Sequence, residues 1–155
     1  MTKIRSLKTQ LENLVISNAT PEDYDSISDL LKTVNLPVQG VQEHLDNFVV
    51  LTDGESIIGT GGLEIYSDKA LLRSLAVHPD YQNRGLGQRI YHHILENSRK
   101  QNIRELYLLT ETAERFFTAI GFETISRELV DEQVKTSEEF RSVCPTTAGC
   151  MRLIL

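Results

Sequence analysis

Two glycines, Gly85 and Gly87, stand one residue apart in the stretch YQNRGLGQRI (residues 81–90), where a strand-like run gives way to a helical pattern. The N-terminus of a helix has backbone N–H groups without intrahelical partners, and glycines let an anion approach them closely. The stretch therefore predicts a phosphate-binding turn. It lacks the Gly-Lys-Ser/Thr ending of a Walker motif, and Ile90 occupies the third glycine position of the dinucleotide fingerprint. A tight strand-to-helix turn without a ligand is the alternative interpretation.

Two charged residues interrupt apolar runs close to this turn. Glu64 is the only charge in GGLEIY, and Arg73 is the only charge in ALLRSLAV. A turn near Ser67-Asp68 would place them opposite each other or one step off in register, so they can neutralise each other across an antiparallel pair. In a second interpretation, compatible with the first, Glu64 is the catalytic base or positions a water, and Arg73 is a bidentate clamp for a substrate carboxylate.

Histidines and cysteines give weaker signals. His78 precedes Pro79 at a strand end, which is typical of a turn residue, and His44 has no evident partner in the sequence. No spacing typical of metal ligands is present, so no metal is expected. Cys144 and Cys150 are expected as free thiols in a reducing compartment, and direct binding of trivalent arsenic by these two thiols is the weaker alternative.

The first half of the chain is expected to form a strand, two helices and an antiparallel meander. Residues 13–19 (NLVISNA) are strand-like, and Thr20 followed by Pro21 marks a helix start. Apolar residues at helical spacing predict one helix up to Val34 and a second, shorter helix with Val41, Leu45 and Phe48 on its apolar face. Three strand-like runs then fill residues 47–77, with turns at 53–54 and 67–68.

The second half alternates helices and strands. A helix is expected from Leu86 to about Gln101, followed by a strand at 105–109 and a short helix that ends at Gly121 in a C-cap position. Residues 122–128 (FETISRE) and 149–155 (GCMRLIL) are expected to supply the last two strands. This order of elements predicts a mixed α/β layer fold that places the glycine turn after the meander.

Composition limits the range of functions. The 155 residues, of which 40% are hydrophobic and 25% charged, fit one soluble domain, expected at 13–155 after an extension of residues 1–12. With 16 Lys and Arg against 22 Asp and Glu, the chain lacks the charge typical of nucleic-acid or membrane binding and favours a small-molecule substrate. The sequence shows no signal peptide and no apolar run near the roughly 20 residues of a membrane span, so a cytoplasmic protein is expected.

Two motifs together resemble the GNAT superfamily of acetyl-CoA-dependent N-acetyltransferases. Residues 75–95 resemble its cofactor motif, with Gln82, Gly85 and Gly87 at the defining positions, and residues 108–122 resemble its second motif, whose helix carries an aromatic pair and ends in Gly-Phe. The resemblance implies a mostly antiparallel sheet of about six or seven strands with about four helices, to which the pantetheine arm of acetyl-CoA adds like an extra strand. The residues implied for cofactor binding are Leu75, Ala76, Val77, Gln82, Asn83, Arg84, Gly85, Leu86, Gly87, Gln88, Thr110, Thr112 and Phe117.

A narrower resemblance covers most of the chain from about Leu14 onward and is most evident in the C-terminal segment. TSEEFRSVCPTTAGCM (136–151) and LLRSLAVHP (71–79) look like the branch of GNAT proteins associated with arsenic resistance. A neighbouring branch acetylates the α-amino group of glutamate-like compounds such as phosphinothricin and its arsenic analogue. The resemblance therefore implies an anionic amino-acid acceptor, with Arg73, Arg141 and Cys144 as candidates for its pocket. A surface arginine and a packed thiol are the alternatives for Arg141 and Cys144.

The sequence also departs from the family pattern. Many members carry a tyrosine that can protonate the leaving thiolate, and the matching residue is Phe117; an asparagine that contacts the cofactor is matched by Thr110 or Thr112. Transfer without this acid is still expected, since a thiolate with a reference pKa of about 8.5 is a tolerable leaving group and binding orients the reactants. The alternative function is a non-catalytic acyl-CoA sensor that regulates a partner. The resemblance also suggests a homodimer.

Overall fold

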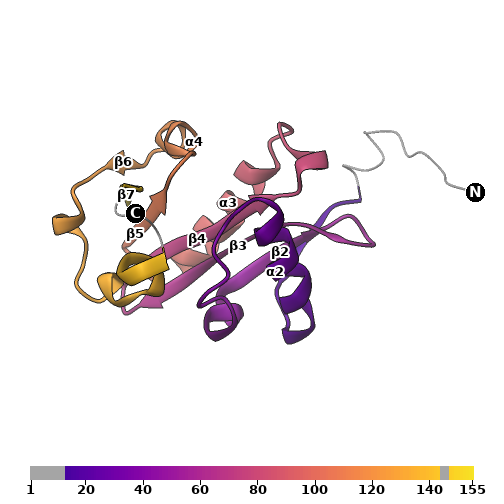
Figure 1. Ribbon diagram of the computed structural model, residues 1–155, viewed down its shortest axis with the longest axis horizontal. Coiled ribbons are helices and arrows are strands. Elements are labelled where there is room, and N and C mark those ends of the chain that lie inside the picture. Colours follow the sequence, from indigo (N-terminus) through magenta and orange to yellow (C-terminus); the bar gives the residue numbers. More distant parts are fainter. Residues whose placement is uncertain (1–12, 144–146) are drawn as a thin grey trace, which may run out of the picture.

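The structure is a computed structural model that describes residues 13–143 and 147–155, with only the backbone of residues 142 and 143. One seven-stranded sheet has the order β1-β2-β3-β4-β5-β7-β6, in which only β4 and β5 are parallel neighbours. The mixed α/β fold expected from the sequence is confirmed (Figure 1). The strands are β1 (Val15–Asn18), β2 (Phe48–Thr52), β3 (Ile57–Tyr66), β4 (Lys69–Val77), β5 (Glu105–Thr110), β6 (Glu123–Thr124) and β7 (Gly149–Ile154).

The helices begin and end where the sequence supplies the necessary signals. Thr20 and Asp23 form a capping box before α2, in which the Thr20 backbone N–H donates to the Asp23 carboxylate over 2.8 Å. The helix after the glycines spans the predicted residues, with Gly85 as its N-cap. The α-helices of the described residues are α2 (Tyr24–Thr33), α3 (Leu86–Lys100) and α4 (Glu114–Ala119), and short helical turns are η1 (Pro21–Asp23), η2 (Gln42–Asn47), η3 (Pro79–Tyr81), η4 (Arg127–Leu129), η5 (Val134–Thr136) and η6 (Glu139–Val143).

Two sequence-based predictions of elements were wrong in part. The second helix is only the 3-10 turn η2, because Phe48 leaves it to open β2, where it lies opposite Gly62. The strand expected over residues 122–128 is only Glu123–Thr124, because Ser126 caps a new 3-10 turn by accepting a hydrogen bond from the backbone N–H of Glu128.

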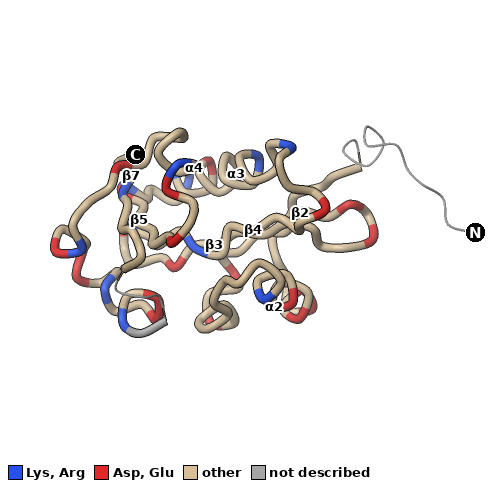
Figure 2. The backbone as a smooth tube through the Cα atoms, turned by 45° about the horizontal axis from the view of Figure 1, so that its top comes forward, with Lys and Arg blue, Asp and Glu red and all other residues tan. Residues whose placement is uncertain are grey.

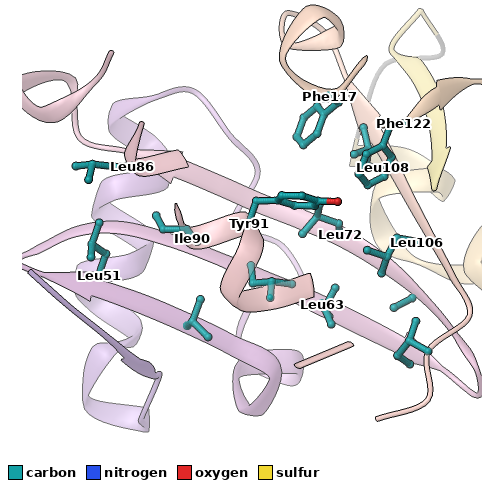
Figure 3. Packing of buried hydrophobic residues seen from close by; sticks show 14 of the residues in the cluster. Leu51, Leu63, Leu72, Leu86, Ile90, Tyr91, Leu106, Leu108, Phe117 and Phe122 are labelled. Carbon is teal, nitrogen blue, oxygen red and sulfur yellow. The ribbon is translucent and has the colours of Figure 1, made fainter. Parts of the chain in front are cut away.

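Helices cover both faces of the sheet. Helices α3 and α4 lie on one side of the strands and α2 lies on the other (Figure 2). The main core packs α3 and α4 onto the sheet through side chains such as Ile90, Tyr91 and Phe117 (Figure 3). On the opposite face α2 and η2 cover β2, and the segment that carries η4 and η5 packs over β4 and β5. No helix among the described residues is long and apolar enough to cross a membrane.

The sheet opens at its centre. Strand β4 pairs with β5 only from Lys69 to Leu71, opposite Glu105–Tyr107, and the pairing stops beyond that point. On its other edge β4 carries a bulge, where the register with β3 shifts between Thr60 and Gly62 and Ser74 adopts a φ of 61°. A left-handed conformation at a residue other than glycine is uncommon inside a strand and often marks a functional site. The opening and the bulge lie beside each other on β4.

Candidate active site

A cavity of about 810 Å³ lies where β4 ends and α3 begins. It contains eleven of the thirteen residues that the resemblance implies for cofactor binding, and α4 supplies its opposite wall. Its lining residues are Leu75, Ala76, Val77, Tyr81, Gln82, Asn83, Gly85, Leu86, Gly87, Gln88, Thr112, Ala113, Arg115, Phe116 and Phe117. Arg84 is exposed beside it, with its guanidinium carbon 5.8 Å from the ring centre of Tyr81.

The turn before α3 has the geometry expected of an anion site. Asn83 and Gly85 both adopt left-handed backbone conformations, with φ values of 65° and 77°, and no side chain in the described part of the chain caps the first turn of the helix. The N–H groups of that turn therefore face the cavity without a side-chain acceptor. Gln82 donates its side-chain amide to the carbonyl oxygen of Val77 over 2.9 Å, which fixes the approach to the turn.

Gly87 is not required by the packing of the protein itself. A Cβ atom at this position would meet only the Phe116 ring, at 3.6 Å, which is an ordinary van der Waals contact. Its backbone conformation does not need glycine either, since Gly87, unlike Asn83 and Gly85, does not have a positive φ. The open space above Gly87 belongs to the cavity, so a ligand that approaches the backbone closely explains the glycine.

Three of the residues implied for cofactor binding, Thr110, Thr112 and Phe117, differ in whether they line this cavity. Thr110 does not line this cavity; its hydroxyl accepts a hydrogen bond from the backbone N–H of Ala113 over 2.9 Å, just before α4. Thr112 and Phe117 do line it. The Phe117 ring packs edge-on against Phe116 and Phe122, with centroids 5.1 and 5.6 Å away, so it supplies an apolar wall.

A second cavity of about 550 Å³ continues from the first along the open edge of β4. The two share Leu75, Ala76, Val77, Gln82, Thr112, Ala113 and Phe117 among their lining residues. The second reaches Thr110 on β5 and then a charged end formed by Arg73, Ser74 and Glu139. A molecule in the second cavity can thus meet a molecule in the first.

Arg73 and Glu64 form a buried ion pair, as the sequence predicts. Arg73 Nη1 lies 2.7 Å from Glu64 Oε2, and the exposed fractions of the two side chains are 0% and 2%. The predicted register was wrong: the turn at Ser67–Asp68 pairs Tyr66 with Lys69, and the regular pairing that follows places Glu64 opposite Leu71 and Arg73 opposite Gly62, two residues from direct opposition. The two side chains therefore meet diagonally on the face opposite α3.

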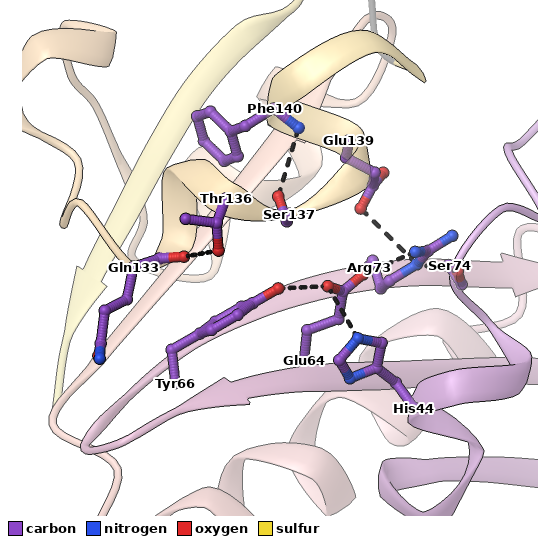
Figure 4. A network of polar contacts seen from close by, with 10 residues as sticks. All are labelled: His44, Glu64, Tyr66, Arg73, Ser74, Gln133, Thr136, Ser137, Glu139 and Phe140. Atoms are coloured by element: carbon purple, nitrogen blue, oxygen red, sulfur yellow. Dashed lines mark hydrogen bonds and ion pairs between the residues drawn. The ribbon is translucent and has the colours of Figure 1, made fainter.

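The ion pair belongs to a larger network that the sequence analysis missed (Figure 4). Glu64 Oε1 accepts a hydrogen bond from the Tyr66 hydroxyl over 2.6 Å and lies 3.2 Å from His44 Nε2. His44 therefore has a partner, although the sequence gave no sign of one. The Arg73 Nε–H donates to the Ser74 hydroxyl over 3.0 Å and lies 3.7 Å from the buried carboxylate of Glu139.

The rest of the guanidinium is enclosed by the chain between α2 and η2. Arg73 Nη2 donates to the carbonyl oxygen of Pro37 over 3.3 Å. Gly40, at a φ of +85°, lies so close that a Cβ there would stand 2.9 Å from Arg73 Nη1. Burial, together with the hydrogen bond to Glu64, raises the pKa of Tyr66, so this phenol stays protonated and donates to the carboxylate.

The carboxylate of Glu64 faces a different cavity. This third cavity, of about 590 Å³, includes Glu64, Tyr66 and His44 and shares no lining residue with the second. The Arg73 guanidinium lies between Glu64 and Glu139 (Figure 4). Of the two glutamates, Glu139 is therefore the one that lines the cavity joined to the glycine turn.

The remaining predicted site residues lie apart from this centre. Arg141 is exposed and lines none of the cavities described above. Cys144 lies outside the described residues. Cys150 is a buried thiol in β7, and burial raises its pKa. His78 has the turn role expected of it, since its Nδ1 accepts from the backbone N–H of Asp80. Among residues 13–143 and 147–155, no group of three or more histidine, cysteine or carboxylate side chains could hold a metal ion.

Comparisons with known proteins point to one family. Residues 44–124 match the family described as acetyltransferase (GNAT) domain. The chain is 32% identical over 126 residues to the uncharacterized protein YwlB of Bacillus subtilis, covering 79% of this chain and 84% of that protein. It is 26% identical over 119 residues to the amino-acid acetyltransferase of Aeromonas salmonicida, covering 71% of this chain but only 27% of that enzyme.

The solved structures agree on the fold. N-acetylglutamate synthase from Neisseria gonorrhoeae, solved with coenzyme A and N-acetyl-glutamate, superposes with a TM-score of 0.79 at 22% identity, over 92% of this chain and 35% of that one. The chain thus spans about a third or less of these amino-acid acetylating enzymes.

Proposed function

The chain belongs to the acetyltransferase (GNAT) family, and from this premise we propose that it transfers the acetyl group of acetyl-CoA to the amine of a small acceptor. One observation carries the proposal: two joined cavities lead from an uncapped helix N-terminus to a buried charged end beside the bulge of β4. A cofactor in the first cavity and an acceptor in the second would meet at residues 75–77, which line both.

The residues of the first cavity suit the pyrophosphate and the pantetheine arm of the cofactor. Backbone N–H groups from Gln82 to Gln88 would hold the pyrophosphate, because the α3 N-terminus offers unpaired donors and Gly87 leaves room. The edge of β4 beyond Leu71 has no pairing with β5, so its backbone can pair with the amide groups of the pantetheine arm as an extra strand would.

The acceptor we propose is an amino acid that presents its α-amine. The support is the amino-acid acetyltransferases among the relatives and the charged end of the second cavity. A narrower form of the proposal rests on the sequence resemblance to the arsenic-associated branch alone. It adds an arsenic-containing analogue of an anionic amino acid to the acceptors and a link to arsenic resistance. A homodimer is also proposed, on the resemblance to the GNAT superfamily as a whole.

The reaction requires a neutral amine and a departing thiolate. An α-amine is mostly protonated near neutral pH, so a base must remove a proton before the nitrogen attacks the thioester. The sequence analysis predicts Glu64 for this role. Phe117 lines the cavity but has no proton to donate, so the proton that the thiolate receives comes from the amine or from water rather than from this side chain.

A screen of amines that records the release of free coenzyme A tests the proposal. Amino acids with acidic, neutral and basic side chains, and an arsenic-containing analogue of glutamate, should be compared, and the acetylated product should be identified by mass spectrometry. Release of coenzyme A in proportion to acetylated amine supports the enzyme. Tight binding of acetyl-CoA with no transfer to any amine would instead support the sensor that the sequence also allows.

A further inference from the structure

We propose that Arg84 binds the 3′-phosphate of the cofactor's nucleotide, and that Asp53 and Tyr81 hold its side chain in position for this contact. The inference rests on the proposed function and extends the same site beyond the pyrophosphate. The sequence analysis placed a turn at 53–54 and gave Tyr81 no role. Such a contact would let the site distinguish acetyl-CoA from thioesters that end at the phosphopantetheine arm.

The side chain of Arg84 differs in position from its neighbours in the glycine turn. Gln82, Asn83 and the residues from Gly85 to Gln88 all line the first cavity, whereas the exposed Arg84 does not. Its guanidinium therefore lies beside the turn and outside the cavity. The pantetheine arm would lie along β4 and the pyrophosphate in the turn, so the part of the cofactor that remains outside is the nucleotide with its 3′-phosphate.

The charge of Arg84 is available to an anion. In the described part of the chain no carboxylate forms an ion pair with its guanidinium, which instead lies over the ring of Tyr81. A phosphate monoester carries about two negative charges near neutral pH, and a planar guanidinium can bind two of its oxygens at once. The backbone N–H groups of the turn serve the pyrophosphate, so the 3′-phosphate requires a separate cation.

Tyr81 connects this arginine to the rest of the fold. It ends η3, lines the first cavity and presents its ring to Arg84, with 5.8 Å between the guanidinium carbon and the ring centre. Its hydroxyl donates a hydrogen bond to Asp53 Oδ2 over 2.9 Å. This bond joins the glycine turn to the turn between β2 and β3, so the ring on which the guanidinium lies is held from both ends.

The two carboxylate oxygens of Asp53 have separate partners. Oδ1 accepts hydrogen bonds from the backbone N–H groups of Glu55 and Ser56 over 3.0 and 2.8 Å, which shapes the turn. Oδ2 accepts the bond from Tyr81. Because Asp53 does not line the first cavity, it would act on the cofactor only through Tyr81 and Arg84. Asp53 is therefore a positioning residue, and it lowers the entropic cost of holding a long arginine side chain.

Two ligands that differ only in the 3′-phosphate test the contact. Calorimetric titration of the full chain should show that the wild type binds coenzyme A about tenfold or more tightly than 3′-dephospho-coenzyme A. Arg84→Gln should lose this difference by weakening the binding of coenzyme A alone. Arg89→Gln makes the same charge change at an exposed arginine of α3 that lines none of the three cavities, and it should match the wild type with both ligands.

A double-mutant cycle tests the positioning role. Tyr81→Phe removes the hydroxyl but keeps the ring, and Asp53→Asn keeps the turn because asparagine can accept the same backbone hydrogen bonds. Each change should weaken the binding of coenzyme A about threefold and leave that of the dephospho form close to the wild type. In the Arg84→Gln background neither change should weaken binding further. Thermal unfolding checks each variant, and Tyr81→Phe carries the test if Asp53→Asn folds poorly.

Four outcomes would overturn the inference. They are equal binding of the two ligands by the wild type, equal losses with both ligands in Arg84→Gln, and a loss in Tyr81→Phe that persists without Arg84. The fourth is loss of the difference in Arg115→Gln alone, which would assign the 3′-phosphate to the arginine that α4 contributes to the first cavity. Tight binding of coenzyme A without acetyl transfer to any amine would contradict the proposed function and leave these binding results standing.

Discussion

The side chain of Arg73 is enclosed by partners within the protein. Its guanidinium is fully buried and bonded to Glu64, Ser74 and Pro37. These contacts favour the ion-pair interpretation, whereas the role of a clamp for a substrate carboxylate stays a prediction.

Arg73→Lys separates the ion-pair role from the clamp role, because lysine keeps the positive charge but cannot make the bidentate hydrogen bonds of a planar guanidinium. If the ion pair is structural, the variant should lower the free energy of unfolding by about 1–3 kcal/mol and change KM equally for anionic and neutral amino acids. Urea unfolding and steady-state kinetics measure the two effects. A rise in KM that is confined to anionic acceptors would establish the clamp.

Gly87 allows binding and stability to be tested independently. Since a Cβ there meets only Phe116 at an ordinary distance, Gly87→Ala should leave the thermal unfolding temperature unchanged or slightly higher. The methyl group would project into the cavity, so affinity for acetyl-CoA should fall about tenfold or more, and Gly87→Asp should lower it further by charge repulsion. Calorimetry checks both variants. Unchanged affinity in both would show that the turn does not hold the cofactor.

At the scale of elements, the pairing of β2 and β3 depends on Gly62, which, unlike Gly87, has no room for a side chain. Gly62 lies directly under the ring of Phe48, so a Cβ atom at this position would overlap the ring. We expect Gly62→Ala to cost about 1–3 kcal/mol in the free energy of unfolding, as overpacking of a core does. Chemical denaturation measures it, with Gly87→Ala as the matched control. Equal stability of the two variants would show that Phe48 can move aside.

Elements with strong local signals could be predicted from the sequence, and those set by packing could not. Helix α3 follows its glycine turn and apolar stripe over the expected residues. The bulge of β4 at Ser74 could not be predicted, because no glycine or proline in this strand marks the irregularity. Glu139 and His44 reach the site through turns far away in the sequence, so only the folded chain brings them together.

At the scale of the molecule, buried phenols make the fold sensitive to alkali. Burial is the largest cause of the raised pKa values of Tyr66, Tyr91 and Tyr107. A group whose pKa is raised by folding stabilises the fold fully below its unfolded pKa, here 10.0, and this contribution is lost as the pH rises through the folded value. The urea midpoint should therefore decrease above about pH 10, and the decrease should be smaller in Tyr66→Phe, whatever the loss of the hydrogen bond to Glu64 costs at lower pH.

The short pairing between β4 and β5 also leads to a prediction about local unfolding of the molecule. Only three residue pairs join the strands β1–β4 to the strands β5–β7, so the two parts are expected to exchange amide hydrogens as separate cooperative units. A cofactor that pairs with the free edge of β4 and contacts α4 would bind both parts at once and stabilise them against separate unfolding. Acetyl-CoA should then slow deuterium uptake in β5 and β7 as strongly as in the glycine turn, although it would touch neither strand along most of its length.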